Sequence, residues 1–316
     1  MSGKAIERVA ITGTGVIGAS WATVFLGHGL HVTASDPAQG AEERLRQTVA
    51  AQWPAMEALG LAPGATIDRL QFAASPEAAV ADAQFVQECG PERLDLKREL
   101  FARLDDAAPA DAILATSSST ITVSEFQDAC ARHPGRVVLG HPFNPPHLIP
   151  LVEVAGGRAT SAGAIERALG FYRSIGKHPI HLKKEIRGHV ANRLQAALWQ
   201  EAFHLVATGV ASVADVDAAI AHGPGLRWAL LGPFVNLHLG GGEGGISALF
   251  GKPLWQATES MWRDLGTATV DAALGRRVAD GVAEELAGRE QAGVVAGRDK
   301  ALIKLLQLKA AADQLP

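Results

Sequence analysis

The chain has 316 residues, enough for two domains of ordinary size, and 47% of them are apolar against 20% charged. The net charge of -4, without any lysine or arginine run, argues against nucleic acid or an anionic membrane as a partner, and no stretch of about 18 uninterrupted apolar residues predicts a membrane span. Cys89 and Cys130 predict neither a disulfide framework nor a zinc site, and no apolar signal region precedes the first strand, so we expect a cytoplasmic protein with reduced thiols.

The first half of the chain alternates short apolar runs with amphipathic stretches. The apolar runs predict strands over 9–12, 31–35, 70–73, 84–88, 113–116, 137–141, 151–154 and 179–182. Helical patterns lie between most of them, for example over 95–106. Strand–helix–strand alternation indicates an α/β fold with a doubly wound, mostly parallel sheet of the Rossmann type, covered by helices on both faces.

The second half loses the strand pattern after about residue 187. Apolar residues over 189–209 have helical spacing and end at a glycine, and the segment 212–223 opens with a capping-box-like Ser212 and Asp215. We therefore expect a Rossmann domain over 1–187 and an all-helical domain over 188–316. The "LGGGEGG" stretch follows no strand, so it is interpreted as a connector and not as a phosphate loop.

A glycine-rich motif, "GTGVIG", joins the first strand to the first helix. Its glycines permit a tight turn, close approach of a pyrophosphate and close helix–strand packing, and the helix presents free N–H groups to phosphates. Asp36 ends the second strand, where a carboxylate holds a ribose 2′-hydroxyl and repels a 2′-phosphate. The pattern predicts NAD as the cofactor, bound by Gly13, Gly15, Val16, Ile17, Gly18 and Asp36.

Polar groups follow the later strands, at the sheet edge where such folds bind ligands. "TSSSTIT" over 116–122 is a hydroxyl cluster, and "GHPFNPP" places His141 at a strand end within a rigid proline frame. Oxidation of an alcohol by hydride transfer requires a base, and histidine has a suitable pKa. Glu153, inside the apolar "LVEV", is placed to orient that imidazole, as the acid does in a catalytic triad. Asn192 stands near the start of a helix.

The chain resembles the 3-hydroxyacyl-CoA dehydrogenase family of two-domain NAD enzymes over nearly its whole length. The resemblance rests on "GTGVIG", "ERLDLKRELF", "TSSSTI", "GHPFNPPHLIPLVEV" and "GHVANRL". It implies a homodimer, His141 as the catalytic base and Glu153 as its partner. It also implies that Asn192 and either Ser118 or Ser119 contact the substrate oxygen. The cofactor contacts that it implies further are Glu92 and Lys97 on the nicotinamide side, and Asn144 nearby.

The chain departs from the CoA-ester enzymes after residue 222. "GPGLRWALLGPF" replaces the short turn expected there, and in this it is similar to the family's L-carnitine and L-gulonate dehydrogenases. Arg227 is a candidate for bidentate binding of a free carboxylate, and Trp228 for a cation–π contact with a trimethylammonium group. Packing or an ion pair are the alternatives for these two residues.

We therefore expect NAD-dependent oxidation of a small free 3-hydroxy acid, with no metal. One rival is a true 3-hydroxyacyl-CoA dehydrogenase, for which only Arg44 and Arg46 follow Asp36 as basic groups for the nucleotide. The other is a non-catalytic, crystallin-like NAD-binding protein, which does not require His141 and Glu153 to be retained.

Overall fold

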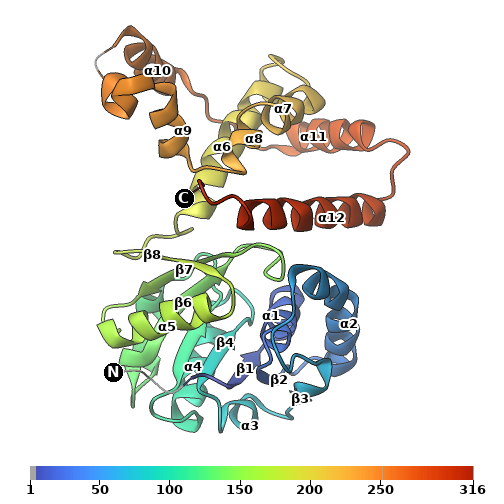
Figure 1. The fold of residues 1–316 in the computed structure, drawn as a ribbon, viewed down its shortest axis with the longest axis vertical. Coiled ribbons are helices and arrows are strands. Elements are labelled where there is room, and N and C mark those ends of the chain that lie inside the picture. Colours follow the sequence, from blue (N-terminus) through green and yellow to red (C-terminus); the bar gives the residue numbers. More distant parts are fainter. Residues whose placement is uncertain (1–4, 251, 316) are drawn as a thin grey trace. The chain divides into compact units, whose positions relative to one another are not determined.

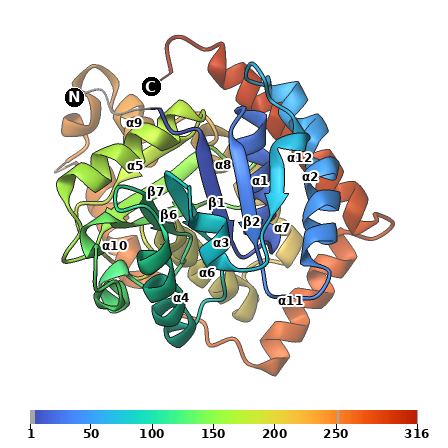
Figure 2. The ribbon, with the colours of Figure 1, turned by 90° about the horizontal axis from the view of Figure 1, so that it is seen from below.

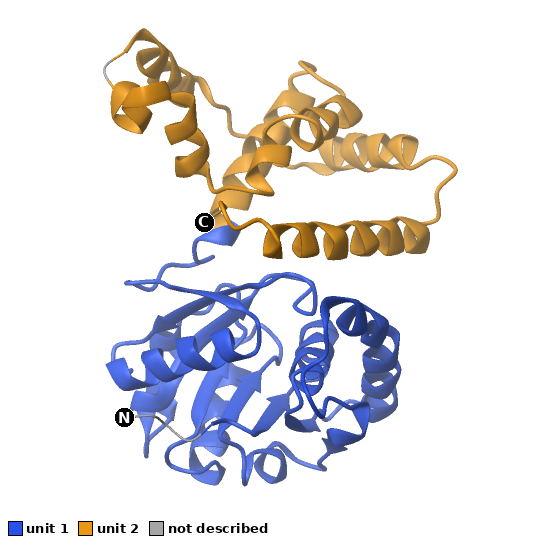
Figure 3. Cartoon of the chain, viewed as in Figure 1, with its two compact units in different colours: residues 1–192 blue, residues 193–316 orange. Residues whose placement is uncertain are grey.

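The computed structural model describes residues 5–250 and 252–315. The chain forms two compact units, Met1–Asn192 and Arg193–Pro316 (Figure 3). The boundary between them follows Asn192, whereas the sequence pattern indicated residue 187.

The first unit is built on one eight-stranded sheet, in the order β3-β2-β1-β4-β5-β6-β7-β8 (Figure 1). Only the β6–β7 pair is antiparallel, so the prediction of a doubly wound, mostly parallel sheet is confirmed. The strands are β1 Arg8–Thr12, β2 His31–Ser35, β3 Leu70–Phe72, β4 Phe85–Glu88, β5 Ile113–Thr116, β6 Val137–Pro142, β7 Leu151–Gly156 and β8 His178–His181. Each expected strand is present, with ends displaced by at most two residues.

Helices cover both faces of this sheet, because the central strands are apolar on both sides (Figures 1 and 2). One face carries a cluster in which Trp21 stacks on Phe25 at 5.2 Å and Phe85 packs on Phe171 at 4.2 Å between ring centroids. The other face packs Phe101 against Phe126, at 4.5 Å between ring centroids, and against aliphatic side chains. The helices of the first face are α1 Val16–Gly27, α2 Ala41–Leu59 and α5 Ala162–Ser174, and those of the second are α3 Pro76–Val80 and α4 Leu94–Ala107.

Short 3-10 turns complete the first unit, at Ile67–Arg69, Val123–Glu125, Gln127–Ala129 and Pro134–Arg136. The loop after β6 contains a cis peptide bond between Asn144 and Pro145. Since all parallel strands point the same way, the loops after β1, β2, β4, β5 and β6 lie at one edge of the sheet.

Among the described residues of the second unit, helices are the only regular secondary structure. It comprises α6 Ala191–Ala207, which starts in the first unit, α7 Val213–Ala221, α8 Pro224–Trp228, α9 Pro233–Gly240, the 3-10 helix Gly242–Ala248, α10 Pro253–Asp264, α11 Ala272–Glu285 and α12 Gln291–Ala310. The capping box of Ser212 and Asp215 is present at the start of α7. The segment expected to be a connector, 239–245, instead ends α9 and begins the 3-10 helix. Among residues 5–250 and 252–315, no helix is long and apolar enough to cross a membrane.

Candidate active site

The glycine-rich loop between β1 and α1 has the geometry of a dinucleotide-binding turn. Gly13 has a φ of +90°, and a Cβ there would lie 2.7 Å from the carbonyl carbon of Cys89. A Cβ on Gly18 would lie 1.9 Å from the Gly13 oxygen, so the helix reaches the loop only without one. At Gly15 a Cβ would meet nothing within 4 Å, and no side chain caps α1, which leaves its N-terminus open to an anion.

Asp36 is fixed beside this loop by three donors. Its Oδ2 accepts hydrogen bonds from the backbone N–H of Thr14 at 2.7 Å and the Thr14 hydroxyl at 3.2 Å, and its Oδ1 accepts one from the N–H of Ala38 at 2.8 Å. A pocket of about 680 Å³ opens here and is lined by Gly13, Gly15 and Asp36 together with Cys89 and Arg103. The glycine loop, the open helix end and the ordered Asp36 carboxylate fit a dinucleotide.

His141 and Glu153 form a buried pair on neighbouring strands. The antiparallel register of β6 and β7 sets the two residues directly opposite each other. The His141 Nδ1 lies 2.9 Å from the Glu153 Oε2, and the two side chains are 5% and 0% exposed. Because a carboxylate only accepts, Nδ1 carries the proton and the other ring nitrogen, Nε2, is left as the basic atom.

Glu153 is held by the start of α6 as well as by His141. Its Oε1 accepts hydrogen bonds from the backbone N–H groups of Val190 at 2.8 Å and Ala191 at 3.0 Å. Burial raises the pKa of this carboxyl, but the bonds from His141, Ala191 and Val190 outweigh burial, so its pKa is lowered overall. A carboxylate that stays ionised beside an imidazole stabilises the imidazolium.

The structure distinguishes the two serines that sequence reasoning left open. The Ser119 Oγ lies 3.2 Å from the His141 Nε2. The Ser118 hydroxyl points elsewhere: it lies 2.7 Å from the Glu92 Oε1 and 2.9 Å from the Ile121 carbonyl oxygen, and Ser118 is 2% exposed. Ser119 is therefore the hydroxyl beside the candidate base, and Ser118 is part of the loop's internal bonding.

Glu92 organises this serine loop rather than lining the pocket. Its Oε1 accepts bonds from Ser118, from the N–H and hydroxyl of Thr120 at 2.7 and 2.8 Å, and from the Ile121 N–H at 3.1 Å. Burial raises the Glu92 pKa, yet these bonds outweigh it and the pKa is lowered. The Lys97 ammonium is buried against Glu88 at 2.9 Å and lies 3.9 Å from Glu92.

Asn192 lies on the first turn of α6, one residue beyond the two N–H groups that bind Glu153. Asn144 is exposed on the loop after β6. In the second unit, Arg227 and Trp228 end α8, and both are exposed, Trp228 by 46%. No ion pair of the Arg227 side chain occurs among the residues that the structure describes.

Sequence reasoning missed two buried residues near this site. His189 is 2% exposed and its ring lies 4.8 Å from that of His141, measured between centroids. Glu88 is buried and forms an ion pair with the Lys97 ammonium at 2.9 Å. Neither carries a sequence signal, since a lone histidine before a helix and a carboxylate ending a strand are both common.

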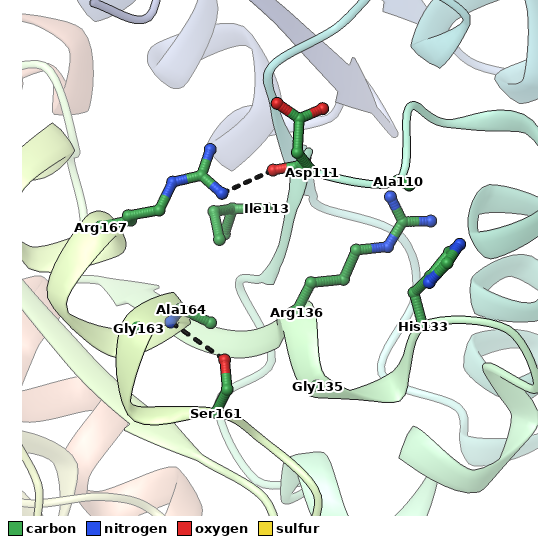
Figure 4. Close-up of a pocket in the computed structure, with 10 residues that line it drawn as sticks. All are labelled: Ala110, Asp111, Ile113, His133, Gly135, Arg136, Ser161, Gly163, Ala164 and Arg167. Atoms are coloured by element: carbon green, nitrogen blue, oxygen red, sulfur yellow. Dashed lines mark hydrogen bonds between the residues drawn. The ribbon is translucent and has the colours of Figure 1, made fainter. Parts of the chain in front are cut away.

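A second pocket, of about 420 Å³, lies at the opposite edge of the sheet, where β5 and β6 begin (Figure 4). Three of its polar side chains already have partners within the chain. Arg167 donates to the Asp111 carbonyl at 2.6 Å, Ser161 caps α5 through the Ala164 N–H, and Arg136 pairs with Asp105 at 2.9 Å. Within the described part of the chain, no group of three or more metal-binding side chains is found.

Two family models match the chain: the NAD-binding domain of 3-hydroxyacyl-CoA dehydrogenase over residues 8–186, and the C-terminal domain of the same enzyme over residues 188–285. The chain is 51% identical to L-carnitine dehydrogenase of Streptomyces griseus over 96% of this chain and 90% of that protein. It is 46% identical to L-carnitine dehydrogenase of Pseudomonas aeruginosa over 95% of this chain and 93% of that protein.

Solved structures agree with this relationship. One is 5-formyl-3-hydroxy-2-methylpyridine 4-carboxylic acid 5-dehydrogenase, an NAD+-dependent dismutase, with a TM-score of 0.83 and 28% identity over 97% of this chain and 99% of that one. Another is 3-hydroxybutyryl-CoA dehydrogenase of Escherichia coli, with a TM-score of 0.67 and 27% identity over 88% of this chain and 57% of that one.

Proposed function

The chain belongs to the 3-hydroxyacyl-CoA dehydrogenase family and is an NAD-dependent oxidoreductase acting on a CH–OH group, and on that premise we propose that it oxidises L-carnitine, or a closely similar free 3-hydroxy acid, to the 3-keto acid. The observation that carries the chemistry is the His141–Glu153 pair. Its unprotonated ring nitrogen, Nε2, faces the Ser119 hydroxyl at 3.2 Å, in the unit that holds the dinucleotide pocket. The substrate class is supported by relatives named L-carnitine dehydrogenases that match nearly the whole chain.

In this mechanism His141 takes the hydroxyl proton of the substrate at Nε2. Glu153 keeps the proton on Nδ1 and stabilises the imidazolium that forms. The Ser119 hydroxyl and the Asn192 amide hold the substrate oxygen next to Nε2, so the proton moves over one hydrogen bond. Bound NAD would supply the acceptor for the hydride that leaves the hydroxyl-bearing carbon.

We assign the cofactor to the pocket at the carboxyl edge of β1, β2 and β4. Gly13, Gly15 and the N-terminal turn of α1, with Val16 and Ile17, would face the pyrophosphate, and Asp36 would hold the ribose hydroxyls. Lys97 and Glu92 act on the nicotinamide side in this assignment by ordering the adjoining loop, and Asn144 lies on a further loop of the same sheet edge.

Arg227 and Trp228 are our candidates for the substrate's two charged ends. A guanidinium binds a carboxylate through two parallel hydrogen bonds, and an indole face attracts a quaternary ammonium. Both side chains are exposed on α8. The CoA alternative has less support, because only Arg44 and Arg46 follow Asp36 as basic groups, and they contact the Gln39 carbonyl at 2.8 Å and Glu42 at 2.7 Å.

We further propose that the second unit forms a homodimer. Of the 17 residues of α6 only Val206 is buried, while Leu194 and Trp199 are 62% and 53% exposed. On α10, Trp262 is 56% exposed. Apolar surface on this scale is typical of an interface with a second copy.

Free thiols at Cys89 and Cys130 fit the reducing cytoplasm, the compartment we propose.

A spectrophotometric panel tests the function. Purified enzyme with NAD is offered L-carnitine, D-carnitine, L-gulonate, 3-hydroxybutyrate and 3-hydroxybutyryl-CoA, and NADH formation is followed. We expect the highest kcat/KM with L-carnitine. A CoA ester preferred over every free acid would favour the CoA alternative, and no turnover of any compound would favour a non-catalytic, crystallin-like protein. Sedimentation of the same sample tests the dimer.

A further inference from the structure

We propose that His189 is a positioning residue for the reaction: its imidazole ties the serine loop to the start of α6, and thereby holds Ser119 and Glu153 on the two sides of His141. The inference rests on the proposed role of His141 as the base. His189 itself touches neither ring nitrogen of His141 through a hydrogen bond, so it would act through its neighbours.

The first connection runs from His189 to Ser119. The His189 Nε2 lies 2.9 Å from the carbonyl oxygen of Ser118, and because a carbonyl only accepts, Nε2 is the donor. That carbonyl belongs to the peptide group joining Ser118 to Ser119, which is planar. Fixing the oxygen therefore restrains the peptide plane from which Ser119 extends, and the Ser119 hydroxyl lies 3.2 Å from the His141 Nε2.

The second connection runs from His189 to Glu153 through the backbone. The two residues that follow His189 donate their N–H groups to the Glu153 Oε1, at 2.8 and 3.0 Å. The other oxygen of Glu153 accepts from the His141 Nδ1 at 2.9 Å. These contacts form a closed ring around His141. Within this ring, the His189 side chain bonds to the serine loop, and the His189 backbone leads directly into the two N–H groups that bind Glu153.

The backbone conformation of His189 differs from that of an ordinary helix start. His189 has a φ of +50°, the only positive φ of a non-glycine residue among residues 5–250 and 252–315. This left-handed conformation is uncommon for side chains with a Cβ. It turns the ring back toward the Ser118 carbonyl while the next two N–H groups continue toward Glu153, and the contacts of the buried ring offset its cost.

The surroundings favour an uncharged His189. Burial lowers the pKa of its imidazole, and a charge on His141 lowers it further, against the Ser118 carbonyl, Glu153 and Glu92, which raise it. Glu185 lines the same small void beneath the ring, but its carboxylate is occupied by the Ser124 N–H at 2.9 Å and by the Ser124 hydroxyl. A neutral ring still donates from Nε2, and it does not oppose the charge that His141 acquires.

The test compares His189→Phe, which keeps an aromatic ring and loses the donor, with His189→Gln, whose amide restores a donor at similar reach. Both replacements share the left-handed backbone, so its cost cancels between them. We expect His189→Phe to lower kcat roughly 3- to 10-fold, the effect of losing one neutral hydrogen bond, with KM for NAD unchanged. We expect His189→Gln to recover most of kcat.

Hydrogen–deuterium exchange provides a readout that does not depend on turnover. In His189→Phe the amides of 117–121 and 189–192 should exchange faster than in the wild type, and His189→Gln should restore protection. The matched control is His28→Phe, which removes another histidine-to-carbonyl contact, His28 Nδ1 to the Val24 oxygen at 2.8 Å, at the far end of α1. It should lower Tm while leaving kcat and exchange at both segments as in the wild type.

The outcomes separate this inference from the proposed function. Wild-type turnover of a 3-hydroxy acid together with unchanged kcat and exchange in His189→Phe would overturn the positioning role alone. A His189→Gln enzyme as impaired as His189→Phe would also overturn it, since the hydrogen bond would not be the cause. If the wild type turned over no 3-hydroxy acid, the proposed function would fail, and the exchange data would still decide whether His189 ties the two segments.

Discussion

Replacing Glu153 by glutamine is the sharpest perturbation of the proposed chemistry, because it changes one oxygen to a nitrogen without changing the volume of the side chain. The carboxylate now accepts three hydrogen bonds, from His141 through Oε2 and from the N–H groups of Val190 and Ala191 through Oε1. An amide has one accepting oxygen and one donating NH2. A single amide therefore cannot accept hydrogen bonds both from the His141 Nδ1 and from the two backbone N–H groups.

Two arrangements are open to the glutamine, and each has a definite consequence. If its oxygen faces the start of α6, its NH2 faces the His141 Nδ1, which must then give up its proton. The ring changes tautomer, Nε2 carries the hydrogen, and it can no longer accept one from the substrate. If the amide is turned around, its NH2 faces two backbone donors in a site where Glu153 is 0% exposed. The first arrangement is less costly.

We expect kcat of Glu153→Gln to fall on the order of 10²–10⁴-fold, the range of general-base catalysis and of a triad histidine forced into the wrong tautomer. The affinity for NADH should stay close to that of the wild type, because Asp36 and the glycine loop are untouched. Steady-state kinetics between pH 6 and 9, with NADH fluorescence titration, measure both quantities.

The matched control is Glu185→Gln, since Glu185 also accepts a backbone N–H, that of Ser124 at 2.9 Å, but does not touch His141. It should retain kcat. A Glu153→Gln enzyme with wild-type kcat over the whole pH range would refute the reasoning, and Glu153 would then be a structural residue only.

Three further predictions concern the cofactor, the substrate and the fold. Asp36→Ser should lower kcat/KM for NAD roughly 10- to 100-fold, the value of a charge-assisted hydrogen bond, and relax the preference over NADP; equal use of both cofactors by the wild type would contradict it. Arg227→Met should reduce kcat/KM for a free 3-hydroxy acid by a similar factor and spare acetoacetyl-CoA, and an unchanged value for the free acid would exclude carboxylate binding by Arg227. Burial lowers the pKa of Lys177 to about 7, so between about 7 and about 10.4 only the unfolded chain binds this proton and stability rises with pH. For Lys177→Met, the free energy of unfolding measured with urea should not show this rise with pH. An equal dependence on pH in both proteins would show that Lys177 stays charged in the folded state.

Most of the fold could be predicted from local patterns in the sequence. Strand positions could be predicted because buried parallel strands must be continuous apolar runs, and the end of the strand pattern near residue 187 marked the change to helices. The turn at Gly13 could be predicted from the glycine spacing of "GTGVIG" between a strand and a helix, and the close approach of Cys89 in the structure shows why a Cβ is excluded there. His141 and Glu153 could also be identified from the sequence, because a proline frame around a histidine and a charge inside an apolar strand are unusual.

The choice between Ser118 and Ser119 needed the tertiary structure. The two serines are adjacent in a loop, where no periodicity assigns a direction to a side chain. The direction is decided by Glu92, 26 residues away along the chain, which accepts the Ser118 hydroxyl and leaves Ser119 to face His141.

The sequence by itself thus determined the elements, the cofactor motif and the His141–Glu153 pair at the centre of the proposed chemistry, since these depend on neighbours along the chain or on adjacent strands. Only the tertiary structure decided which serine hydroxyl faces His141 and which histidine bonds to the Ser118 carbonyl. His189 bonds to a carbonyl 71 residues earlier, and such a contact leaves no local pattern because it depends on how distant loops are brought to one edge of the sheet.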